Sequence, residues 1–240
     1  HQEILLAVFH TLRALVHNRT ETLIRFGDRK GIQLTVRSML FLRQSEEVQL
    51  AGTALLLDLT PSKANREIIG QFFCIEVVIT AMQTSRSRLD LIGTGCAFLA
   101  NVAFQSEENK RTIAKSGGIK RLLRALRENA SDETIVMWAA LALRNLAFNN
   151  SENKMLMTKQ GGLRYLVDAA MNCRESEKVE THIMGAILNI IKEDKNNAEH
   201  LFKLFGLDLV IQLMRNFRNS IDIQSSCCAI LRELTYLADT

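Results

Sequence analysis

Proline and aromatic residues are scarce in this chain. Among its 240 residues Pro61 is the one proline, and Phe, Trp and Tyr together account for 6%. With 47% hydrophobic and 23% charged residues, the composition is typical of a soluble helical protein and argues against intrinsic disorder. The shortage of aromatic side chains also leaves few surfaces on which nucleic-acid bases could stack.

Strong charge of one sign and long apolar runs are also lacking. The net charge of +4 is too small to indicate nucleic acid, so we expect no nucleic-acid partner. No apolar run reaches the roughly 18 to 20 residues of a membrane span, so we expect membrane association only indirectly or through flanking sequence. The chain begins with His1 inside an apolar helical pattern, without Met or a signal peptide, and we expect a fragment of a longer protein.

Cysteine is present in an odd number and in no metal-binding motif. The five cysteines lie mostly within apolar runs: Cys74, Cys96, Cys173, Cys227 and Cys228. There is no Cys-x-x-Cys motif, and the five histidines are not spaced as metal ligands. We therefore expect buried, reduced thiols in a cytoplasmic protein, with a nuclear location as the alternative, and neither a metal nor another cofactor.

One stretch, Ala139 to Leu163, sets the pattern for the whole chain. It reads AALALRNLAFNNSENKMLMTKQGGL, an apolar helical run, a polar loop and two glycines before the next apolar run. Similar segments recur every 44 residues, with one spacing of 43. The position of Asn145, called the anchor below, is occupied in turn by Ala14, Asp58, Asn101, Asn145, Asn189 and Glu233. Two series of apolar residues keep the same period, which predicts a repeat protein.

The repeat predicts a single domain over residues 1–240, since no linker interrupts it. The expected units are a partial first unit 1–43, full units 45–86, 87–130, 131–174 and 175–219, and a closing helix 221–239. Each full unit is expected to contain a long, a short and a medium helix.

Local signals mark the ends of these helices in the fourth unit. We expect helices at 132–148, 151–160 and 162–173, with Ser131-Asp132 and Ser151 as plausible N-caps. The glycines supply the positive φ that ends a helix abruptly. In the second unit Cys74 replaces the glycine, so we expect another turn geometry there.

Two positions of every long helix are predicted to form the core. They lie two residues before and one residue after the anchor, about 60° apart around a helix. The first set is Leu12, Leu56, Leu99, Leu143, Ile187 and Leu231, and the second is Leu15, Leu59, Val102, Leu146, Ile190 and Leu234. One unit alone cannot bury such a stripe, so neighbouring units are expected to stack as a solenoid, whose end units need further cover.

The repeated motif resembles the armadillo repeat. The resemblance rests on Leu143-Arg-Asn-Leu-Ala147, followed by a loop, an Asn, an apolar residue and Gly161-Gly162-Leu163, and on the similar segment around Asn101. It extends over essentially all 240 residues and is weakest in the end units. It implies an all-α, right-handed superhelical solenoid of about five three-helix armadillo repeats of 44 residues. Helix pairs of the HEAT type are the near alternative.

The same resemblance implies a protein partner. In armadillo proteins an asparagine ladder on the groove-lining helix, the long helix here, binds the backbone of an extended peptide. This role carries over to Asn101, Asn145 and Asn189, because an amide side chain both donates and accepts hydrogen bonds. The alternative is that each asparagine caps or bridges neighbouring helices. Small residues four before the anchor, such as Gly185, either admit a ligand's main chain or relieve crowding.

A mixed aromatic, apolar and basic spot is expected beside Asn145 and Asn189. Its members are Trp138, Leu141, Arg144 and His182, and aromatic and arginine side chains dominate interface hot spots. The alternative is that Trp138 packs between units. Nuclear-signal carriers similar to importin-α have Trp four residues before the asparagine. This chain lacks that array, which disfavours binding of classical nuclear signals.

A secondary basic patch is expected at Arg121, Arg124 and Arg127. It would meet an acidic partner or an anionic membrane. Because Glu107, Glu108 and Glu128 are interleaved, an ordinary solvated helix face is the alternative.

No catalytic constellation is found, so we expect no enzyme. The sequence favours a non-enzymatic scaffold or adaptor that holds an extended segment of a partner protein in the concave groove. The alternatives are a regulatory or organelle-positioning adaptor that acts through its outer basic face, and an autoinhibitory armadillo segment of a larger enzyme.

Overall fold

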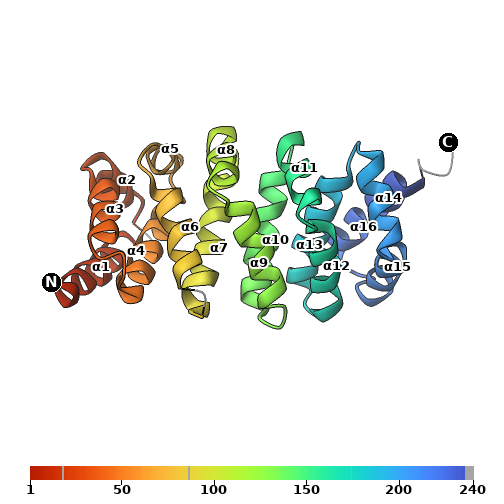
Figure 1. The fold of residues 1–240 in the computed structure, drawn as a ribbon, viewed down its shortest axis with the longest axis horizontal. Helices are drawn as coiled ribbons and strands as arrows, with labels where there is room; N and C mark the ends of the chain where they lie inside the picture. Colours follow the sequence, from red (N-terminus) through yellow and green to blue (C-terminus); the bar gives the residue numbers. More distant parts are fainter. Residues whose placement is uncertain (18, 86, 174, 236–240) are drawn as a thin grey trace. The chain divides into compact units, whose positions relative to one another are not determined.

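The computed structural model describes residues 1–17, 19–85, 87–173 and 175–235. These residues form sixteen α-helices and no strand (Figure 1). The helices are α1 Gln2–Val16, α2 Thr20–Asp28, α3 Gly31–Phe41, α4 Glu46–Leu59, α5 Lys63–Gln71, α6 Cys74–Thr84, α7 Leu89–Ala103, α8 Glu107–Lys115, α9 Gly118–Glu128, α10 Glu133–Ala147, α11 Ser151–Lys159, α12 Gly162–Asn172, α13 Glu177–Ile191, α14 Lys195–Lys203, α15 Gly206–Asn216 and α16 Ile221–Thr235. The predicted order of long, short and medium helices is therefore found five times, from α1–α3 to α13–α15, and α16 follows as the last helix.

The chain divides into two compact units. Unit 1 is His1–Arg121 and unit 2 is Leu122–Thr240, so the boundary falls within α9. The single domain over residues 1–240 stays a prediction. The expected end of the closing helix at 239 lies outside the described residues, and α16 is described as far as Thr235.

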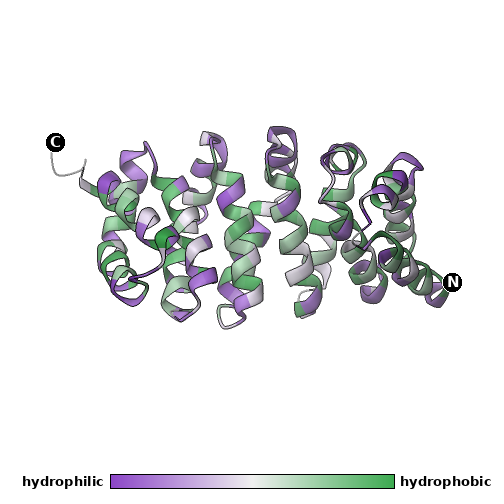
Figure 2. Cartoon of the chain, turned by 180° about the vertical axis from the view of Figure 1, so that it is seen from behind, coloured by the Kyte–Doolittle hydropathy of each residue, from purple (hydrophilic) through white to green (hydrophobic). Residues whose placement is uncertain are grey.

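Each unit stacks its long helices side by side. In unit 1, α4 packs against α1 and α7, and α3 packs against α6. In unit 2, α13 packs against α10 and α16, and α12 packs against α15 (Figure 1). Figure 2 shows the long helices as largely hydrophobic and the short helices, such as α8, as mostly hydrophilic. This contrast follows from burial of the long helices between their neighbours.

The predicted core stripe is confirmed in the inner repeats. Leu56, Leu99 and Leu143 have no exposed surface, and their partners one residue after the anchor are equally buried. The prediction is wrong for Leu15, whose side chain is 45% exposed, because α1 has a long-helix neighbour on one side only among the described residues. Leu12 and Leu231, on the two end helices, are half-buried.

Polar side chains begin the helices as the sequence indicates, with one correction. Asp132 accepts a hydrogen bond from the Ile135 backbone N–H at 3.0 Å and caps α10. The cap of α11 is Asn150 rather than Ser151, because its Oδ1 accepts the Asn153 N–H at 2.9 Å. Ser151 is the first residue inside the helix.

The turn before each medium helix uses one backbone geometry throughout. Gly117 and Gly161 have φ of 78° and 77°, and at the same repeat position Phe73 and Phe205 have φ of 54° and 60°. The expectation of a different geometry at Cys74 is therefore wrong, since the positive φ falls on the residue before it. A side chain in this left-handed region costs on the order of 1 kcal/mol, which glycine avoids.

No single helix in the described part of the chain is both long and apolar enough to cross a membrane. By length and composition alone, α5 and α6 together pass the same test as a pair bent by 73°.

Candidate peptide-binding face

Most of the predicted groove residues lie on two adjacent helices of unit 2. Trp138, Leu141, Arg144 and Asn145 are on α10, and His182 and Asn189 are on α13, which packs against α10. All six side chains are half-buried. Asn101 is on α7 in unit 1 and is half-buried too. Half-buried polar groups of this kind can bond to a neighbouring helix and still reach a ligand.

Asn189 bridges the two helices without using all of its amide. Its Nδ2 donates a hydrogen bond to the Arg144 backbone carbonyl at 2.9 Å. A primary amide has two N–H donors and a carbonyl acceptor. Among the described residues no second hydrogen bond of the Asn189 side chain is found. One donor and the acceptor therefore remain for a ligand.

Asn101 follows the same pattern in unit 1. Its Nδ2 donates to Thr60 Oγ1 at 2.8 Å, and the buried Thr60 hydroxyl donates to the Leu57 carbonyl at 2.7 Å. The helix-bridging role that the sequence left open thus holds for one N–H of Asn101 and one of Asn189. Peptide binding by Asn101, Asn145 and Asn189 stays a prediction.

Arg144 lies across Gly185 on the neighbouring helix. A Cβ added to Gly185 would approach Arg144 Nε to 2.6 Å, so only glycine lets the guanidinium lie this close. Gly185 is therefore covered by Arg144 and does not itself line an open channel. No ion pair of Arg144 is found among the described residues, which leaves its charge available.

His182 lies beside this positive charge. Burial holds the pKa of His182 below its ordinary value, and the charges of Arg144 and Lys178 lower this pKa further. Its Nδ1 is buried and has no hydrogen-bond partner among the described residues. Desolvation and like charge both favour the neutral imidazole. The α10–α13 face thus carries the fixed charge of Arg144 next to a mostly neutral histidine.

The equivalent arginine of unit 1 has a different environment. Arg13 occupies the repeat position of Arg144, one residue before the anchor, and its Nε donates to Asp58 Oδ2 at 2.7 Å. Asp58 is the anchor residue of the next repeat. The ion pair balances the charge of Arg13, whereas in unit 2 the corresponding anchor is the neutral Asn189.

The predicted basic patch is not one exposed surface. Arg121 is 3% exposed, so its place in an outer patch was a wrong prediction. The same repeat position holds the buried Val77 and Leu209 but also the exposed Leu34 and the half-buried Tyr165, so the signal in the sequence that Arg121 is buried was weak. Arg124 pairs with Glu128 at 2.6 Å, which further reduces the free charge.

Sequence reasoning missed the role of a second asparagine series. Four buried residues, called the second-helix asparagines below, share the 44-residue spacing: Asn65, Asn109, Asn153 and Asn197. Their Nδ2 atoms donate to a carbonyl near the end of the preceding long helix, as Asn109 does to Val102 at 3.0 Å. Asn109 also donates to the Arg66 carbonyl of the neighbouring repeat at 3.3 Å. The period alone could have identified this series.

In the part of the chain that the structure describes, the cysteines form no cluster with other metal-ligating residues. No group of three His, Cys, Asp or Glu side chains suited to a metal ion occurs in the described part of the chain. All five cysteines are free thiols; four are buried and Cys228 is exposed. Burial raises the pKa of Cys74 and of Cys96 to about 12, which keeps these thiols protonated.

Comparisons with known proteins place the fold. A family model described as the spinocerebellar ataxia type 10 protein domain matches residues 94–171, which is less than half of the chain. No curated protein sequence matches the chain. A designed armadillo repeat protein superposes with a TM-score of 0.85 at 18% identity, over 98% of this chain and 94% of that one.

Two further structures match similarly. A designed armadillo repeat protein in complex with the peptide (KR)4 gives a TM-score of 0.82 at 18% identity, over 97% of this chain and 94% of that one. A structure described as "A conserved phosphorylation switch controls the interaction between cadherin and beta-catenin in vitro and in vivo" gives 0.87 at 15% identity. That match covers 100% of this chain and 44% of the other. The fold is thus that of an all-α armadillo-repeat solenoid.

Proposed function

We propose that this armadillo-repeat chain is a non-enzymatic scaffold that holds an extended segment of another protein along its long helices. The observation that carries the proposal is the hydrogen-bonding capacity that Asn189 leaves unused among the described residues, beside Arg144, for which no ion pair is found there. The structural neighbour in complex with (KR)4 supports a peptide as the kind of ligand. Because that neighbour is only 18% identical, its peptide does not predict which segment this chain binds. The chemistry of the α10–α13 face must indicate that segment.

The arrangement on unit 2 suits backbone recognition. Asn145 and Asn189 would bond to peptide N–H and C=O groups, which do not depend on the ligand's side chains. Trp138 and Leu141 offer apolar contact, and Arg144 offers a charge to an acidic side chain of the segment. The free, buried thiols accord with the reducing cytoplasm or nucleus that we propose as its location.

The experiment is a selection of random 12-residue peptides displayed against the full chain, followed by affinity measurement for the selected peptides. We expect Asn145→Ala and Asn189→Ala each to weaken binding about 3- to 10-fold, as loss of one or two hydrogen bonds implies. The exposed Asn196 on α14 is the matched control, and Asn196→Ala should change nothing.

A second experiment tests the contribution of the peptide's own backbone hydrogen bonds to binding. Methylation of two peptide nitrogens removes ligand N–H donors and keeps every ligand side chain, so affinity should fall with the wild-type chain. If both asparagine variants bind every selected peptide as tightly as the wild type does, the proposed function is wrong.

The alternatives gain less support. An adaptor acting through an outer basic face would need Arg121 at the surface, where it does not lie. No observation on the described residues favours an autoinhibitory role over a scaffold.

A further inference from the structure

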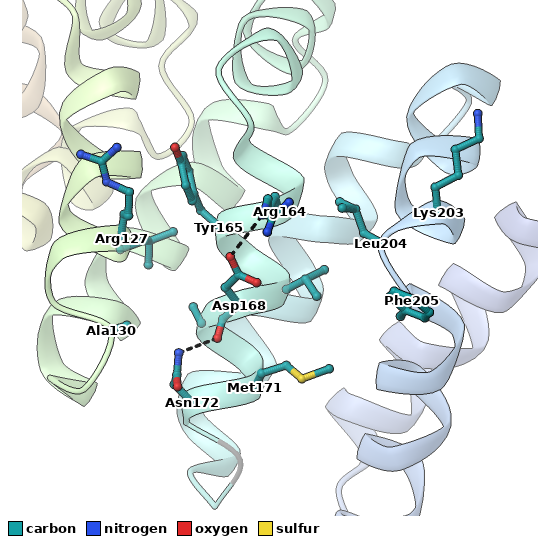
Figure 3. A pocket seen from close by; sticks show the side chains of 13 residues that line it. Arg127, Ala130, Arg164, Tyr165, Asp168, Met171, Asn172, Lys203, Leu204 and Phe205 are labelled. Carbon is teal, nitrogen blue, oxygen red and sulfur yellow. Dashed lines mark hydrogen bonds and ion pairs between the residues drawn. The ribbon is translucent and has the colours of Figure 1, made fainter.

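A second concave site lies in unit 2, away from the α10–α13 face. It is a cavity of about 640 Å³ lined by the end of α9, by α12 and by the turn between α14 and α15. Figure 3 shows Tyr165 on the side of Arg127, and Met171 extending toward Phe205. None of the predicted groove residues lines this cavity, whereas Arg127 of the predicted basic patch does.

One wall of the cavity is apolar and unusually exposed. Phe205 is 70% exposed, and Met171 and Leu204 are partly exposed beside it. Isolated exposed apolar residues are ordinary, but an exposed aromatic at the rim of a cavity resembles an interface anchor. A side chain inserted between Met171 and Phe205 would remove this surface from water.

Phe205 is also a poor choice for its own backbone. Its φ of 60° lies in the left-handed region, where the equivalent residues Gly117 and Gly161 avoid a Cβ. Glycine at position 205 would serve the turn better than phenylalanine does. The aromatic ring therefore adds nothing evident to the fold, although it exposes apolar surface and strains the turn. Phe73 shares this exposure and backbone strain, so the place of Phe205 at the rim of the cavity is what distinguishes it.

The rim of the cavity carries mostly positive charge. Arg127, Arg164 and Lys203 line it together with the carboxylate of Asp168, and Arg127 Nη2 also lies 3.5 Å from Glu128 Oε1. Asp168 pairs only loosely with Arg164, at 3.8 Å between Oδ2 and Nε. Lys203 has no ion pair among the described residues. The Arg127 guanidinium lies 5.9 Å from the centre of the Tyr165 ring. An occupant with negative charge would complement this rim.

We propose that this cavity docks a linear segment of another protein, in which an aromatic or long aliphatic side chain is flanked by Asp or Glu. The apolar side chain contacts Met171 and Phe205, and the carboxylates pair with Arg164 and Lys203. Nucleic acid fits less well, because the cavity places apolar side chains where a phosphate backbone would need donors. The docking site is separate from the long-helix face and does not depend on the proposed function.

The test is a display selection of random 12-residue peptides on the full chain carrying Asn145→Ala and Asn189→Ala, so that long-helix binding does not dominate. Selected clones should be enriched in Phe, Leu or Met beside Asp or Glu. Phe205→Gly should reduce their affinity at least about tenfold, as loss of a hot-spot residue does. Because it also relieves backbone strain, this variant should unfold no more easily than its parent.

Two further variants complete the design. Phe73→Gly removes an equally exposed phenylalanine, 69% against 70%, from the same repeat position in unit 1, and it should leave the affinity unchanged. The double variant Lys203→Glu with Arg164→Glu should lose affinity for the acidic peptides and gain affinity for basic ones. Raising the salt concentration should weaken the binding of the acidic peptides to the parent chain.

Several results would overturn the proposal. One is enrichment without acidic residues. Another is equal affinity of the parent and its Phe205→Gly variant. A third is equal loss with Phe73→Gly. Sedimentation of the chain alone is the last control, because a dimer that Phe205→Gly dissociates would make a second copy of this chain the occupant instead.

Discussion

Two asparagine series run through this protein with the same 44-residue period but in different surroundings. Asn109, a second-helix asparagine, is 2% exposed, donates to two backbone carbonyls, and packs its Oδ1 against Gly70 of the neighbouring repeat. Asn189, on a long helix, is half-buried and donates once. Asn109 uses both of its N–H donors and packs its Oδ1 against Gly70, whereas Asn189 has a donor and an acceptor left over among the described residues.

The comparison separates a structural amide from a candidate binding amide. Spacing cannot make the distinction, because both series recur once per repeat. Burial and unused hydrogen-bonding capacity can make it. The predictions below test this difference, beginning with the largest expected effect.

Asn109→Ala should lower the free energy of unfolding by about 2 to 3 kcal/mol, because the Val102 and Arg66 carbonyls lose their shared partner in a buried place. Urea denaturation followed by circular dichroism measures the change. Asn101→Ala, which removes one half-buried bond, should cost about 1 kcal/mol or less. Equal losses of unfolding free energy in the two variants would contradict the distinction between the second-helix and the long-helix asparagines.

Gly70→Ala should destabilise the chain by about 1 to 3 kcal/mol, because the new methyl group would meet Asn109 Oδ1. The same denaturation measurement applies. In the double variant Gly70→Ala with Asn109→Ala, the methyl group no longer meets the amide. The loss of unfolding free energy in the double variant should then be smaller than the sum of the two single-variant losses by more than about 0.5 kcal/mol. Additive losses would show that the amide does not pack on Gly70.

Arg13→Ala should lower the free energy of unfolding by at most about 0.5 kcal/mol, because its ion pair with Asp58 is partly exposed. Arg144→Ala, at the same repeat position in unit 2, should cost no more, since no ion pair of Arg144 is found among the described residues. Arg144→Ala should nevertheless weaken the binding of those long-helix-face peptides that carry an acidic residue. If Arg13→Ala weakens the binding of those peptides as much as Arg144→Ala does, Arg144 is not the partner of their acidic residue.

The smallest effect concerns His182. Because burial and the nearby positive charges lower its pKa from the ordinary value of 6.5, the folded state binds this proton less readily than the unfolded state does. Its contribution to stability is therefore present above about pH 6.5 and is lost as the pH falls toward the lowered pKa. Titration of the His182 ring by NMR should give a pKa below 6.5, and Arg144→Ala should raise it. A pKa that Arg144→Ala leaves unchanged would contradict this account.

The sequence predicted the architecture because the architecture is periodic. Core positions such as Leu99 and Leu143, the helix order and the cap at Asp132 could all be derived from a pattern that repeats. The errors occur where one repeat departs from its neighbours. Arg121 occupies a position that holds Val77 and Leu209 in other repeats, and Leu15 lies on α1, which has a long-helix neighbour on one side only among the described residues.

The sites were less predictable, because they depend on side-chain geometry. The sequence placed Arg144 next to Asn145 but could not tell that it lies across Gly185, or that Arg13 finds an acidic partner in Asp58. The cavity at Phe205 was not predicted either. An aromatic residue at a position where two other repeats have glycine, Gly117 and Gly161, was the available signal, and its exposure became evident only in the fold.

The most direct test follows the side-chain amide signals of the asparagines by NMR while a peptide selected on the long-helix face is added. We predict that the Asn145 and Asn189 amide signals shift and exchange more slowly with solvent. The signals of Asn153 and Asn197, the second-helix asparagines of the same unit, should stay unchanged. A bound peptide that leaves the Asn145 and Asn189 signals unchanged would contradict the proposal that the long-helix asparagines bind the ligand.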